Sequence, residues 1–283
     1  MTLKLGLIGH PISHSLSPWI HAKFIDLAGL NGGEYKLYEG NPNQLPDVLT
    51  QLKQNKIDGF NVTIPYKQVV LDYLDELDSD AEILGAVNTV VNQHGKWKGG
   101  YSTDGGEGYV RSIIESFPSL LNKDTSVLIL GAGGGAARGI YRALVQKRLK
   151  RVDIANRTLD KAKELLPLGK DFTPSEVLTF HTAEKNLSQY DLIVQTTSVG
   201  MKPKVQEQII QLDNIRKDTV VSDIVYQPIM TKILQDAKVH GARIHHGHAM
   251  LLYQGQLAFE KWTGKKLDVS HLVDELEDKL RGE

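Results

Sequence analysis

Two charged side chains, Lys67 and Asp104, stand among uncharged polar residues in the first part of this 283-residue sequence. A lysine can remove or return a proton, and a carboxylate can orient its ammonium group. The hydroxyl and amide groups nearby are donors and acceptors suited to a small molecule that carries hydroxyl or carboxylate groups. They come from Ser15, Ser17, Asn61, Thr63 and Asn88. The residue types predict proton transfer on a small polar substrate.

These residues fall into four short clusters, each where a predicted strand or hairpin meets a loop or a helix. The clusters are HSLSP at 14–18, NVTIPYK at 61–67, GAVNT at 85–89 and STDG at 102–105. In open α/β sheets, ligands bind at that edge. Taken singly, each residue also has a structural interpretation: Ser17 as a helix cap, Asn88 as a turn residue or Lys67 as a surface residue. Their shared position at one kind of edge favours a binding site.

Pro65 predicts the start of a helix, because its fixed φ and missing N–H suit the first helical position. Lys67 would then lie in the first turn, beside the positive end of the helix dipole, where a cation is disfavoured. The dipole would favour the neutral form of Lys67, which can accept a proton, and Asp104 would oppose part of this effect.

Strands and helices alternate from Lys4 to about Val91, which predicts a sheet covered by helices. A strand at 3–9 precedes a helix in which Ser17 is the expected N-cap, Pro18 the first residue and Gly29 the stop signal. That helix is expected to bury Ile20, Phe24, Leu27 and Ala28. Further strands are expected at 34–40 and 57–62, a helix at 43–54, and a hairpin that turns near His94 and Gly95.

A second unit follows the glycine-rich stretch STDGGEGY. Strands at 125–131, 151–156, 190–197 and 219–226 alternate with helices, which is typical of a doubly wound Rossmann-type domain. After Met250 the chain carries two amphipathic helices, LLYQGQLAFEKW and LVDELEDKL, and no strand of their own. Periodicity does not tell which domain they cover.

The stretch SVLILGAGGGAARG has the dinucleotide-binding frame G-x-G-x-x-A at Gly131, Gly133 and Ala136. The first glycine makes a tight turn, the second lets the backbone approach a pyrophosphate, and the small third residue lets the helix pack closely. The frame follows a strand and opens a helix, which favours cofactor binding over a purely structural turn. The whole segment is Gly131, Ala132, Gly133, Gly134, Gly135 and Ala136.

The end of the next strand indicates which dinucleotide binds. An NAD site usually has an acidic residue there, which binds the ribose 2′-hydroxyl. This sequence instead has Asn156, Arg157 and Thr158, with Lys161 one turn later. Two cations suit a 2′-phosphate, so we predict NADP. The alternative is a solvated helix start, but cations are disfavoured at that end without an anion.

Composition excludes several classes of protein. The 33 basic and 34 acidic residues give a net charge of −1, which argues against nucleic-acid binding. The sequence has no cysteine, hence no disulfide, thiolate metal ligand or cysteine nucleophile, and no compact His/carboxylate cluster suggests a metal. It has neither a signal peptide nor an apolar run long enough for a membrane. We expect a soluble, cytoplasmic protein.

The motifs in their order resemble the shikimate dehydrogenase family, NADP-dependent enzymes that interconvert 3-dehydroshikimate and shikimate. They are GHPISHSLSP, GFNVTIPYK, GAVNT, STDG, GAGGGAARG, ANRT, TTSVGM, SDIVYQP and GHAMLLYQGQLAFEKWTG, and they cover nearly the whole chain. The resemblance implies a role in aromatic amino-acid biosynthesis. It also implies an N-terminal α/β substrate domain, a Rossmann-type NADP-binding domain and C-terminal helices that return to the first domain. The expected boundaries are 1–104 with 250–283, and 105–249.

The resemblance also implies roles for individual residues. Lys67 and Asp104 would be the catalytic pair. Ser15, Ser17 and Tyr226 would hold the substrate carboxylate, and the ring hydroxyls would contact Asn61, Thr63, Asn88, Asp104 and Gln254. The adenosine 2′-phosphate would contact Asn156, Arg157, Thr158 and Lys161, and the nicotinamide would lie near Ile224 and Gly247.

Two features depart from the family pattern. Ser102 replaces the usual Asn, and both glycine-rich turns are one residue longer than expected. Two other functions stay open: a quinate/shikimate dehydrogenase of broader specificity, against which Arg157 argues, and a non-catalytic NADP-binding regulatory homologue, against which Lys67 and Asp104 argue. The sequence does not distinguish a monomer from a homodimer.

Overall fold

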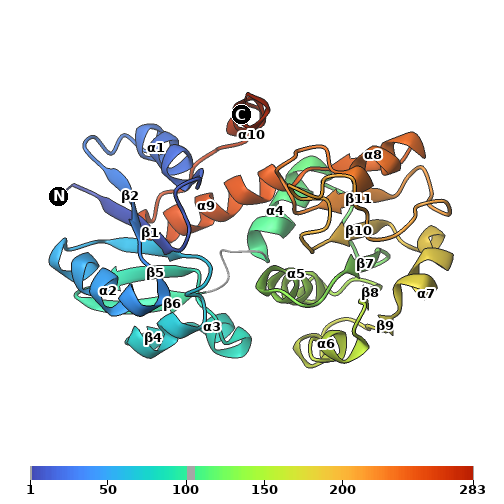
Figure 1. The fold of residues 1–283 in the computed structure, drawn as a ribbon, viewed down its shortest axis with the longest axis horizontal. Coiled ribbons are helices and arrows are strands. Elements are labelled where there is room, and N and C mark those ends of the chain that lie inside the picture. Colours follow the sequence, from blue (N-terminus) through green and yellow to red (C-terminus); the bar gives the residue numbers. More distant parts are fainter. Residues whose placement is uncertain (1, 101–105, 283) are drawn as a thin grey trace. The chain divides into compact units, whose positions relative to one another are not determined.

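The structure is a computed structural model that describes residues 2–100 and 106–282. The chain divides into two compact units (Figure 1). The first contains Met1–Asp104 and Gln254–Val269, and the second contains Gly105–Tyr253 and Ser270–Glu283. The predicted catalytic residue Asp104 and the unusual Ser102 lie outside the described residues.

The first unit is built on a six-stranded mixed sheet with the strand order β2-β1-β3-β5-β6-β4. β1 (Lys4–Gly9) is parallel to β2 (Glu34–Glu39) and β3 (Gly59–Val62). β5 (Thr89–Gln93) is antiparallel to β3 and β6 (Lys96–Gly100), and β4 (Glu76–Leu77) is parallel to β6. The ends of β1, β3 and β6 therefore meet the start of β5 at one edge of the sheet.

The predicted hairpin is confirmed. His94 and Gly95 connect β5 to β6, with φ of 55° and 89°. Two consecutive positive φ values give the short turn whose twist matches that of the paired strands. Gln93 and Lys96 are the last pair before the turn.

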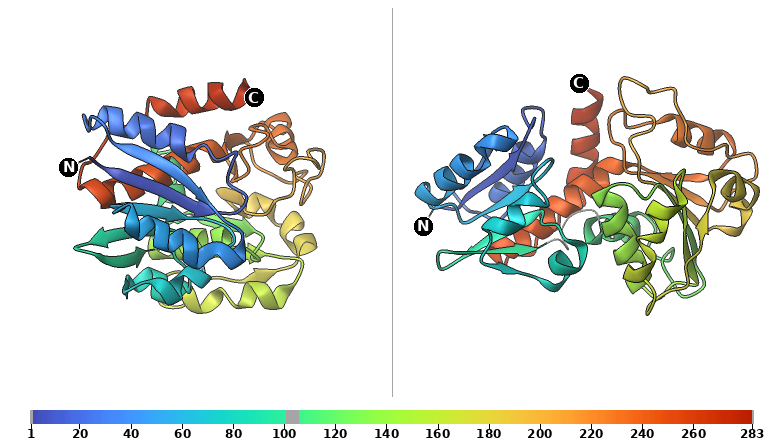
Figure 2. Two further views of the ribbon diagram at one scale, coloured as in Figure 1. Left: turned by 60° about the vertical axis from the view of Figure 1, so that its left-hand side comes forward. Right: turned by 60° about the horizontal axis from the view of Figure 1, so that its bottom comes forward.

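Helices cover both faces of this sheet (Figures 1 and 2). α2 (Leu45–Gln54) covers one face and buries the predicted apolar stripe, while α1 (Ser17–Leu27) and the later part of α9 (Gly247–Thr263) cover the other. The expected face of α1 is partly wrong, because Leu27 is 46% exposed and His21 is buried in its place. The remaining helices are η1 (Pro42–Gln44), η2 (Val69–Tyr73) and α3 (Ser79–Leu84).

The second unit is a doubly wound α/β domain, as predicted. Its six strands are all parallel and follow the order β12-β11-β10-β7-β8-β9. Read from β9, this is the Rossmann order 3-2-1-4-5-6, with the switch point between β7 and β10. The strands are β7 (Ser126–Leu130), β8 (Arg151–Ala155), β9 (Val177–Leu178), β10 (Leu192–Gln195), β11 (Val220–Asp223) and β12 (Arg243–His245).

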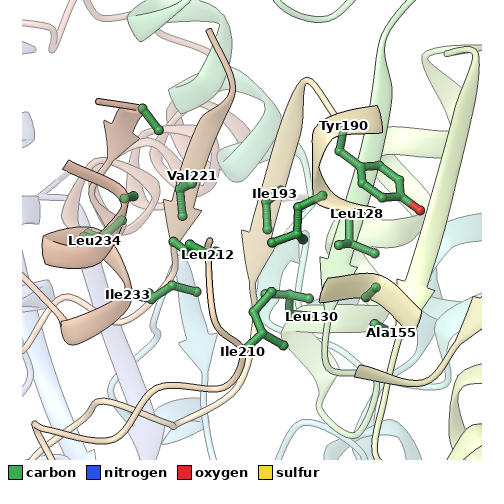
Figure 3. Close-up of a cluster of buried hydrophobic side chains, with 14 residues drawn as sticks. Leu128, Leu130, Ala155, Tyr190, Ile193, Ile210, Leu212, Val221, Ile233 and Leu234 are labelled. Atoms are coloured by element: carbon green, nitrogen blue, oxygen red, sulfur yellow. The ribbon is translucent and has the colours of Figure 1, made fainter. Parts of the chain in front are cut away.

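The core of this unit lies between the sheet and the helices of one face (Figure 3). Leu128, Ile193 and Val221 project from neighbouring strands toward Ile233 and Leu234 of α8 (Lys232–Val239), and all five are buried. Buried aliphatic side chains of this kind each stabilise the fold by about 1.5–3 kcal/mol. The other helices are α4 (Glu107–Ser116), α5 (Gly135–Gln146), α6 (Leu159–Lys163), η3 (Leu166–Leu168), α7 (Phe180–Lys185) and η4 (Leu187–Gln189).

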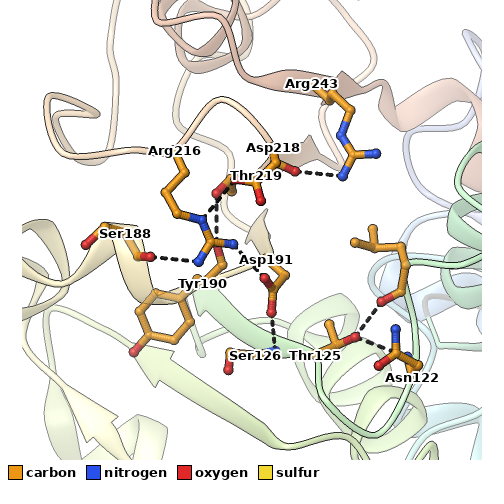
Figure 4. A network of polar contacts seen from close by, with 11 residues as sticks. Asn122, Thr125, Ser126, Ser188, Tyr190, Asp191, Arg216, Asp218, Thr219 and Arg243 are labelled. Carbon is orange, nitrogen blue, oxygen red and sulfur yellow. Dashed lines mark hydrogen bonds and ion pairs between the residues drawn. The ribbon is translucent and has the colours of Figure 1, made fainter.

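A polar network fastens the amino ends of the strands (Figure 4). The guanidinium of Arg216 donates to Asp191 Oδ1 at 2.6 Å, to Asp218 Oδ1 at 2.9 Å and to the Ser188 carbonyl at 2.9 Å. Asp191 Oδ2 accepts the amide of Ser126 at 2.8 Å, which links the starts of β7 and β10. This edge is structural and leaves the opposite, carboxyl edge for ligands.

The C-terminal segment belongs to both units. Trp262 Nε1 of α9 donates to the Val90 carbonyl at 2.9 Å within the first unit. The expected boundary placed residues 250–283 there, but α10 (Leu272–Arg281) is part of the second unit. Glu277 of α10 lies 3.6 Å from the Nε2 atom of His248, another residue of that unit. Among the described residues, no helix combines the length and the apolar composition needed to span a bilayer.

Candidate active site

Backbone hydrogen bonds hold polar clusters of the first unit together at the sheet edge. The Thr63 amide donates to the Ile8 carbonyl at 3.0 Å, which fixes NVTIPYK at the end of β1. The Val87 amide donates to the Lys67 carbonyl at 2.7 Å, which ties the lysine turn to GAVNT. The cluster STDG lies outside the described residues, which stop at Gly100, the end of β6, and resume at Gly106.

The predicted helix beginning at Pro65 is wrong. Residues 64–68 form turns, and the 3-10 helix η2 starts only at Val69. Buried Tyr66 holds this turn, because its amide donates to the Thr63 carbonyl at 2.9 Å and its hydroxyl donates to the Gly40 carbonyl. Lys67 is half-buried and precedes η2, so the helix-dipole argument does not apply to it.

The start of α1 differs from the prediction in one residue. Leu16 is the N-cap and Ser17 is the first helical residue, so the predicted capping role of Ser17 is wrong. The Ser17 amide instead donates to Ser15 Oγ at 3.2 Å, because the Ser15 side chain reaches the open amides of the first turn. Both hydroxyls are half-buried at a helix N-terminus, where a bound anion is favoured.

Asn61 is bonded within the unit through both ends of its amide. Its Oδ1 accepts the Tyr35 hydroxyl at 2.8 Å, and its Nδ2 donates to the Asn88 carbonyl and to Thr89 Oγ1, both at 3.2 Å. The side chain thus joins β2, β3 and the start of β5. Asn61 stays a predicted substrate contact, but its donors are already used by protein groups.

Sequence reasoning missed Tyr35 and His21, which lie behind these polar residues. Their rings are stacked with centroids 4.2 Å apart and an interplanar angle of 8°. Burial lowers the pKa of His21 to about 3 and raises the pKa of Tyr35, so both are neutral at pH 7. The spacing in the sequence could have indicated that His21 is buried, because it lies three residues before Phe24 and four before Ile25, on the packed face of the helix.

In the second unit, the glycine-rich turn has space for a phosphate-bearing ligand. Gly131 has φ of 104°, and a Cβ there would overlap Thr197 Cγ2, so only glycine fits. A Cβ at Gly133 or Gly134 would meet nothing within 4 Å. Gly134 is also the N-cap of α5 and supplies no side-chain acceptor to the first helical amides. Such a helix start suits a pyrophosphate.

The loop after β8 lies beside this turn. Asn156 Oδ1 accepts the Ala132 amide at 3.2 Å, and its Nδ2 donates to the Thr158 carbonyl at 2.7 Å. Arg157 and Lys161 are exposed, and within residues 2–100 and 106–282 neither forms an ion pair. Their neighbour Lys163, by contrast, contacts Asp160 at 2.9 Å. Two unneutralised cations at the carboxyl end of β8 suit the 2′-phosphate of NADP.

The other predicted cofactor residues lie at the end of β11 and the start of α9. The Ile224 amide donates to the Gln195 carbonyl at 3.1 Å. Gly247 approaches the Ile224 carbonyl so closely that a Cβ would overlap it. Tyr226, two residues after Ile224, is half-buried, and burial raises its pKa. Gln254 is half-buried in the part of α9 that belongs to the first unit.

A buried carboxyl group that the sequence did not reveal organises this region. Asp223 accepts from Gln195 Nε2 at 3.0 Å, from the Val225 amide at 2.9 Å and from Thr231 Oγ1 at 2.6 Å. Burial raises the pKa of Asp223 to about 7. The side chain fixes the loops after β10 and β11, which carry TTSVGM and IVYQP.

Protein-family models match most of the chain. The shikimate dehydrogenase substrate binding domain matches residues 7–90, the shikimate / quinate 5-dehydrogenase model matches residues 115–239, and the shikimate 5'-dehydrogenase C-terminal domain matches residues 247–277. These ranges include both regions described above, the polar sheet edge and the glycine-rich turn.

Individual relatives are similar to this chain along nearly its whole length. The shikimate dehydrogenase (NADP(+)) of Oceanobacillus iheyensis is 49% identical over 284 residues and covers 100% of both chains. A Listeria monocytogenes shikimate 5-dehydrogenase, solved with shikimate and NAD, is 33% identical with a TM-score of 0.86 and covers 99% of this chain and 96% of its own. The Thermus thermophilus enzyme, solved with NADP(H) and shikimate, is 29% identical with a TM-score of 0.84 and 99% coverage of both chains. The chain therefore belongs to the shikimate dehydrogenase family.

Proposed function

We propose that the protein is an NADP-dependent shikimate dehydrogenase that interconverts 3-dehydroshikimate and shikimate in aromatic amino-acid biosynthesis. The observation that carries the proposal is the polar sheet edge of the first unit, where backbone hydrogen bonds hold the Lys67 turn beside GAVNT. The full-length identity to a shikimate dehydrogenase (NADP(+)) supports it.

Lys67 is the proposed general acid and base. In the oxidation of shikimate, the hydride leaves the carbinol carbon and Lys67 accepts the hydroxyl proton, while in the reverse reaction Lys67 returns a proton to the alkoxide. The Val87–Lys67 backbone bond and buried Tyr66 hold the turn that carries this side chain. Asp104 is the proposed partner that orients the ammonium group. Bound NADP supplies the hydride acceptor or donor.

The remaining polar residues bind substrate in this proposal. Ser15 and Ser17 receive its carboxylate at the start of α1, where the helix dipole favours an anion. Thr63 and Asn88 lie at the ends of adjacent strands and contact ring hydroxyls. Tyr226, Gln254 and Asp104 are further contacts that the family resemblance adds.

The second unit holds the cofactor. The open backbone at Gly133 and Gly134, with the start of α5, receives the pyrophosphate. Arg157 and Lys161 bind the 2′-phosphate, and this pair sets the preference for NADP over NAD. The residues proposed to contact the cofactor are Gly131, Ala132, Gly133, Gly134, Gly135, Ala136, Asn156, Arg157, Thr158, Lys161, Ile224 and Gly247.

The test is shikimate-dependent formation of NADPH by the purified protein, followed by its near-ultraviolet absorbance. We expect turnover with shikimate and NADP, and a lower kcat/KM with either NAD or quinate. A clear preference for NAD would contradict the role of Arg157. Absence of turnover despite bound NADP would instead indicate a non-catalytic homologue.

A quinate/shikimate dehydrogenase is the second candidate, because the family model for residues 115–239 is described for both substrates. Equal kcat/KM for quinate and shikimate would favour it. Quinate carries an additional ring hydroxyl, so the comparison measures how closely the polar edge fits the ring.

A further inference from the structure

A buried tyrosine hydroxyl connects two of the predicted substrate contacts. The Tyr35 O–H donates to Asn61 Oδ1 at 2.8 Å. The phenol oxygen is also hydrogen-bonded to the Ser17 side chain, and because its own proton is used on Asn61, Ser17 is the donor in that bond. Tyr35 therefore restrains the Ser17 hydroxyl and the Asn61 amide together. It is only 9% exposed and has no part in the reaction proposed above.

Aromatic packing fixes the position of this phenol. The ring of His21 stacks on Tyr35 at 4.2 Å, and Phe24 and Trp262 contact the other sides of the imidazole with centroids at 5.4 and 5.3 Å. Gly255 of α9 packs closely against α1 beside this stack, because a Cβ there would lie 3.3 Å from Ile20 Cγ2 and 3.4 Å from Phe24 Cε2. The stack has little freedom to turn, so the hydroxyl of Tyr35 has one position.

His21 also completes the bonding of Asn61. Its ring is hydrogen-bonded to the Asn61 side chain, and within the described residues its Nδ1 has no partner, so Nε2 faces the amide. The oxygen of Asn61 then accepts from Tyr35 and His21, while its nitrogen serves Asn88 and Thr89. A fully bonded amide has one orientation.

We infer that Tyr35 is a positioning residue for substrate binding: it holds the Ser17 hydroxyl where the substrate carboxylate binds, and the His21 stack holds Tyr35. The inference rests on the proposed function, which makes Ser17 a carboxylate contact. Tyr35 touches no substrate and acts on affinity through Ser17. A hydroxyl held in place loses less rotational freedom on binding, which strengthens the complex.

The test uses Tyr35→Phe, which keeps the buried ring and removes only the oxygen. Loss of one neutral hydrogen bond changes binding by about 0.5–1.5 kcal/mol, so we expect the KM for shikimate to rise about threefold to tenfold. The kcat and the KM for NADP should change by less than about twofold, since neither depends on the carboxylate contact. Calorimetric titration with shikimate checks the affinity without turnover.

Tyr38→Phe is the matched control. Tyr38 lies on the same strand, is buried to a similar degree, and its ring packs against Gly6 instead of the Ser17 cluster. This variant should keep the wild-type KM. If both variants lowered thermal stability equally and neither moved the KM, Tyr35 would be a structural residue only and the inference would be wrong.

A double-mutant cycle tests whether Tyr35 acts through Ser17. The Tyr35→Phe change should raise the KM for shikimate much less in the Ser17→Ala background than in the wild type, because only the bond from Tyr35 to Asn61 is then left to lose. Multiplying effects would contradict the inference. The wild-type control separates the two proposals: failure to oxidise shikimate contradicts the proposed function, whereas normal oxidation with an unchanged Tyr35→Phe KM contradicts the positioning role alone.

Discussion

The two predicted ligand regions are built in opposite ways. At the sheet edge of the first unit, the polar groups are already bonded to one another, as the amide of Asn61 shows with its bonds to Tyr35 and Thr89. In the second unit, a Cβ at Gly133 or Gly134 would meet no atom, and Arg157 is exposed. One region is crowded and cross-linked, and the other is open.

The difference follows from the ligands proposed for each region. A small ring with several hydroxyls is recognised by donors and acceptors whose directions are fixed before it arrives, which requires supporting residues behind them. A dinucleotide presents phosphates, which bind backbone amides and cations and need open space near a helix start. Substitutions in the first region should therefore affect chemistry and folding, and substitutions in the second should affect affinity.

The largest expected effect is the loss of the proton-transfer group in the crowded region. We expect Lys67→Ala to lower kcat by about 10²–10⁴-fold, the usual contribution of a general acid or base, with a weaker effect on the KM for shikimate. Steady-state kinetics with shikimate and NADP measure both. Lys96→Ala, an exposed lysine at the start of β6, is the control and should keep wild-type kinetics. An unchanged kcat in Lys67→Ala would refute its catalytic role.

A smaller effect is expected from the open region, and on a different constant. Arg157→Ala removes a charge-assisted contact to the 2′-phosphate, worth about 1.5–3 kcal/mol, so the KM for NADP should rise on the order of tenfold to a hundredfold. The kcat should stay near wild type. Lys163→Ala is the control, because this lysine lies on α6, which begins shortly after Arg157, but is paired with Asp160. If the KM for NADP did not change, the 2′-phosphate would bind elsewhere.

Two glycines test crowding against openness directly. A Cβ at Gly9 would overlap Thr63 Cγ2 and lie 2.6 Å from Ile12 Cγ2, whereas a Cβ at Gly134 would meet nothing. Gly9→Ala should lower the free energy of unfolding by about 1–3 kcal/mol, as overpacking does. Gly134→Ala should stay within about 0.5 kcal/mol of wild type. Urea unfolding followed by circular dichroism measures the free energy of unfolding of both variants. Equal decreases would contradict the claim that the first region is crowded and the second is open.

The sequence predicted most of the elements because their signals are local. The stripe at Leu45, Val48, Leu49 and Leu52, the His94–Gly95 turn and the strand–glycine–helix pattern at Gly131 each depend on residues near in sequence. The sheet edge that gathers the polar clusters followed from a general rule of α/β topology.

What the sequence could not predict depends on contacts between distant residues. The hydroxyl of Tyr66 donates to the Gly40 carbonyl, 26 residues away in the sequence, and this bond holds the turn that contains Lys67. The helix predicted from Pro65 does not form there, because a contact between distant residues determines the local structure. The sequence shows His21 only as a polar residue on an apolar helix face. Its burial depends on the rings of Tyr35 and Trp262, which are distant in the sequence. Asp223 likewise gains its role from Gln195 and Thr231.

The smallest expected effect is a change in acid sensitivity that reports on the crowded unit alone. Burial lowers the pKa of His21 from 6.5 to about 3, so between these values the unfolded chain binds a proton that the folded unit does not. The free energy of unfolding should therefore fall as the pH falls through this range, by up to about 1.4 kcal/mol per pH unit for this group.

His21→Phe keeps an aromatic ring on Tyr35 and removes the titrating group, so its stability should depend less on pH than that of the wild type. All three tryptophans, Trp19, Trp97 and Trp262, belong to the first unit, so their fluorescence during urea unfolding follows that unit. His245 in the second unit has its pKa lowered in the same way, and His245→Asn is the control that should leave the tryptophan transition unchanged. Parallel pH profiles for wild type and His21→Phe would show that the pKa of His21 is the same in the folded and the unfolded chain. Such a result would contradict the burial of the imidazole against Tyr35.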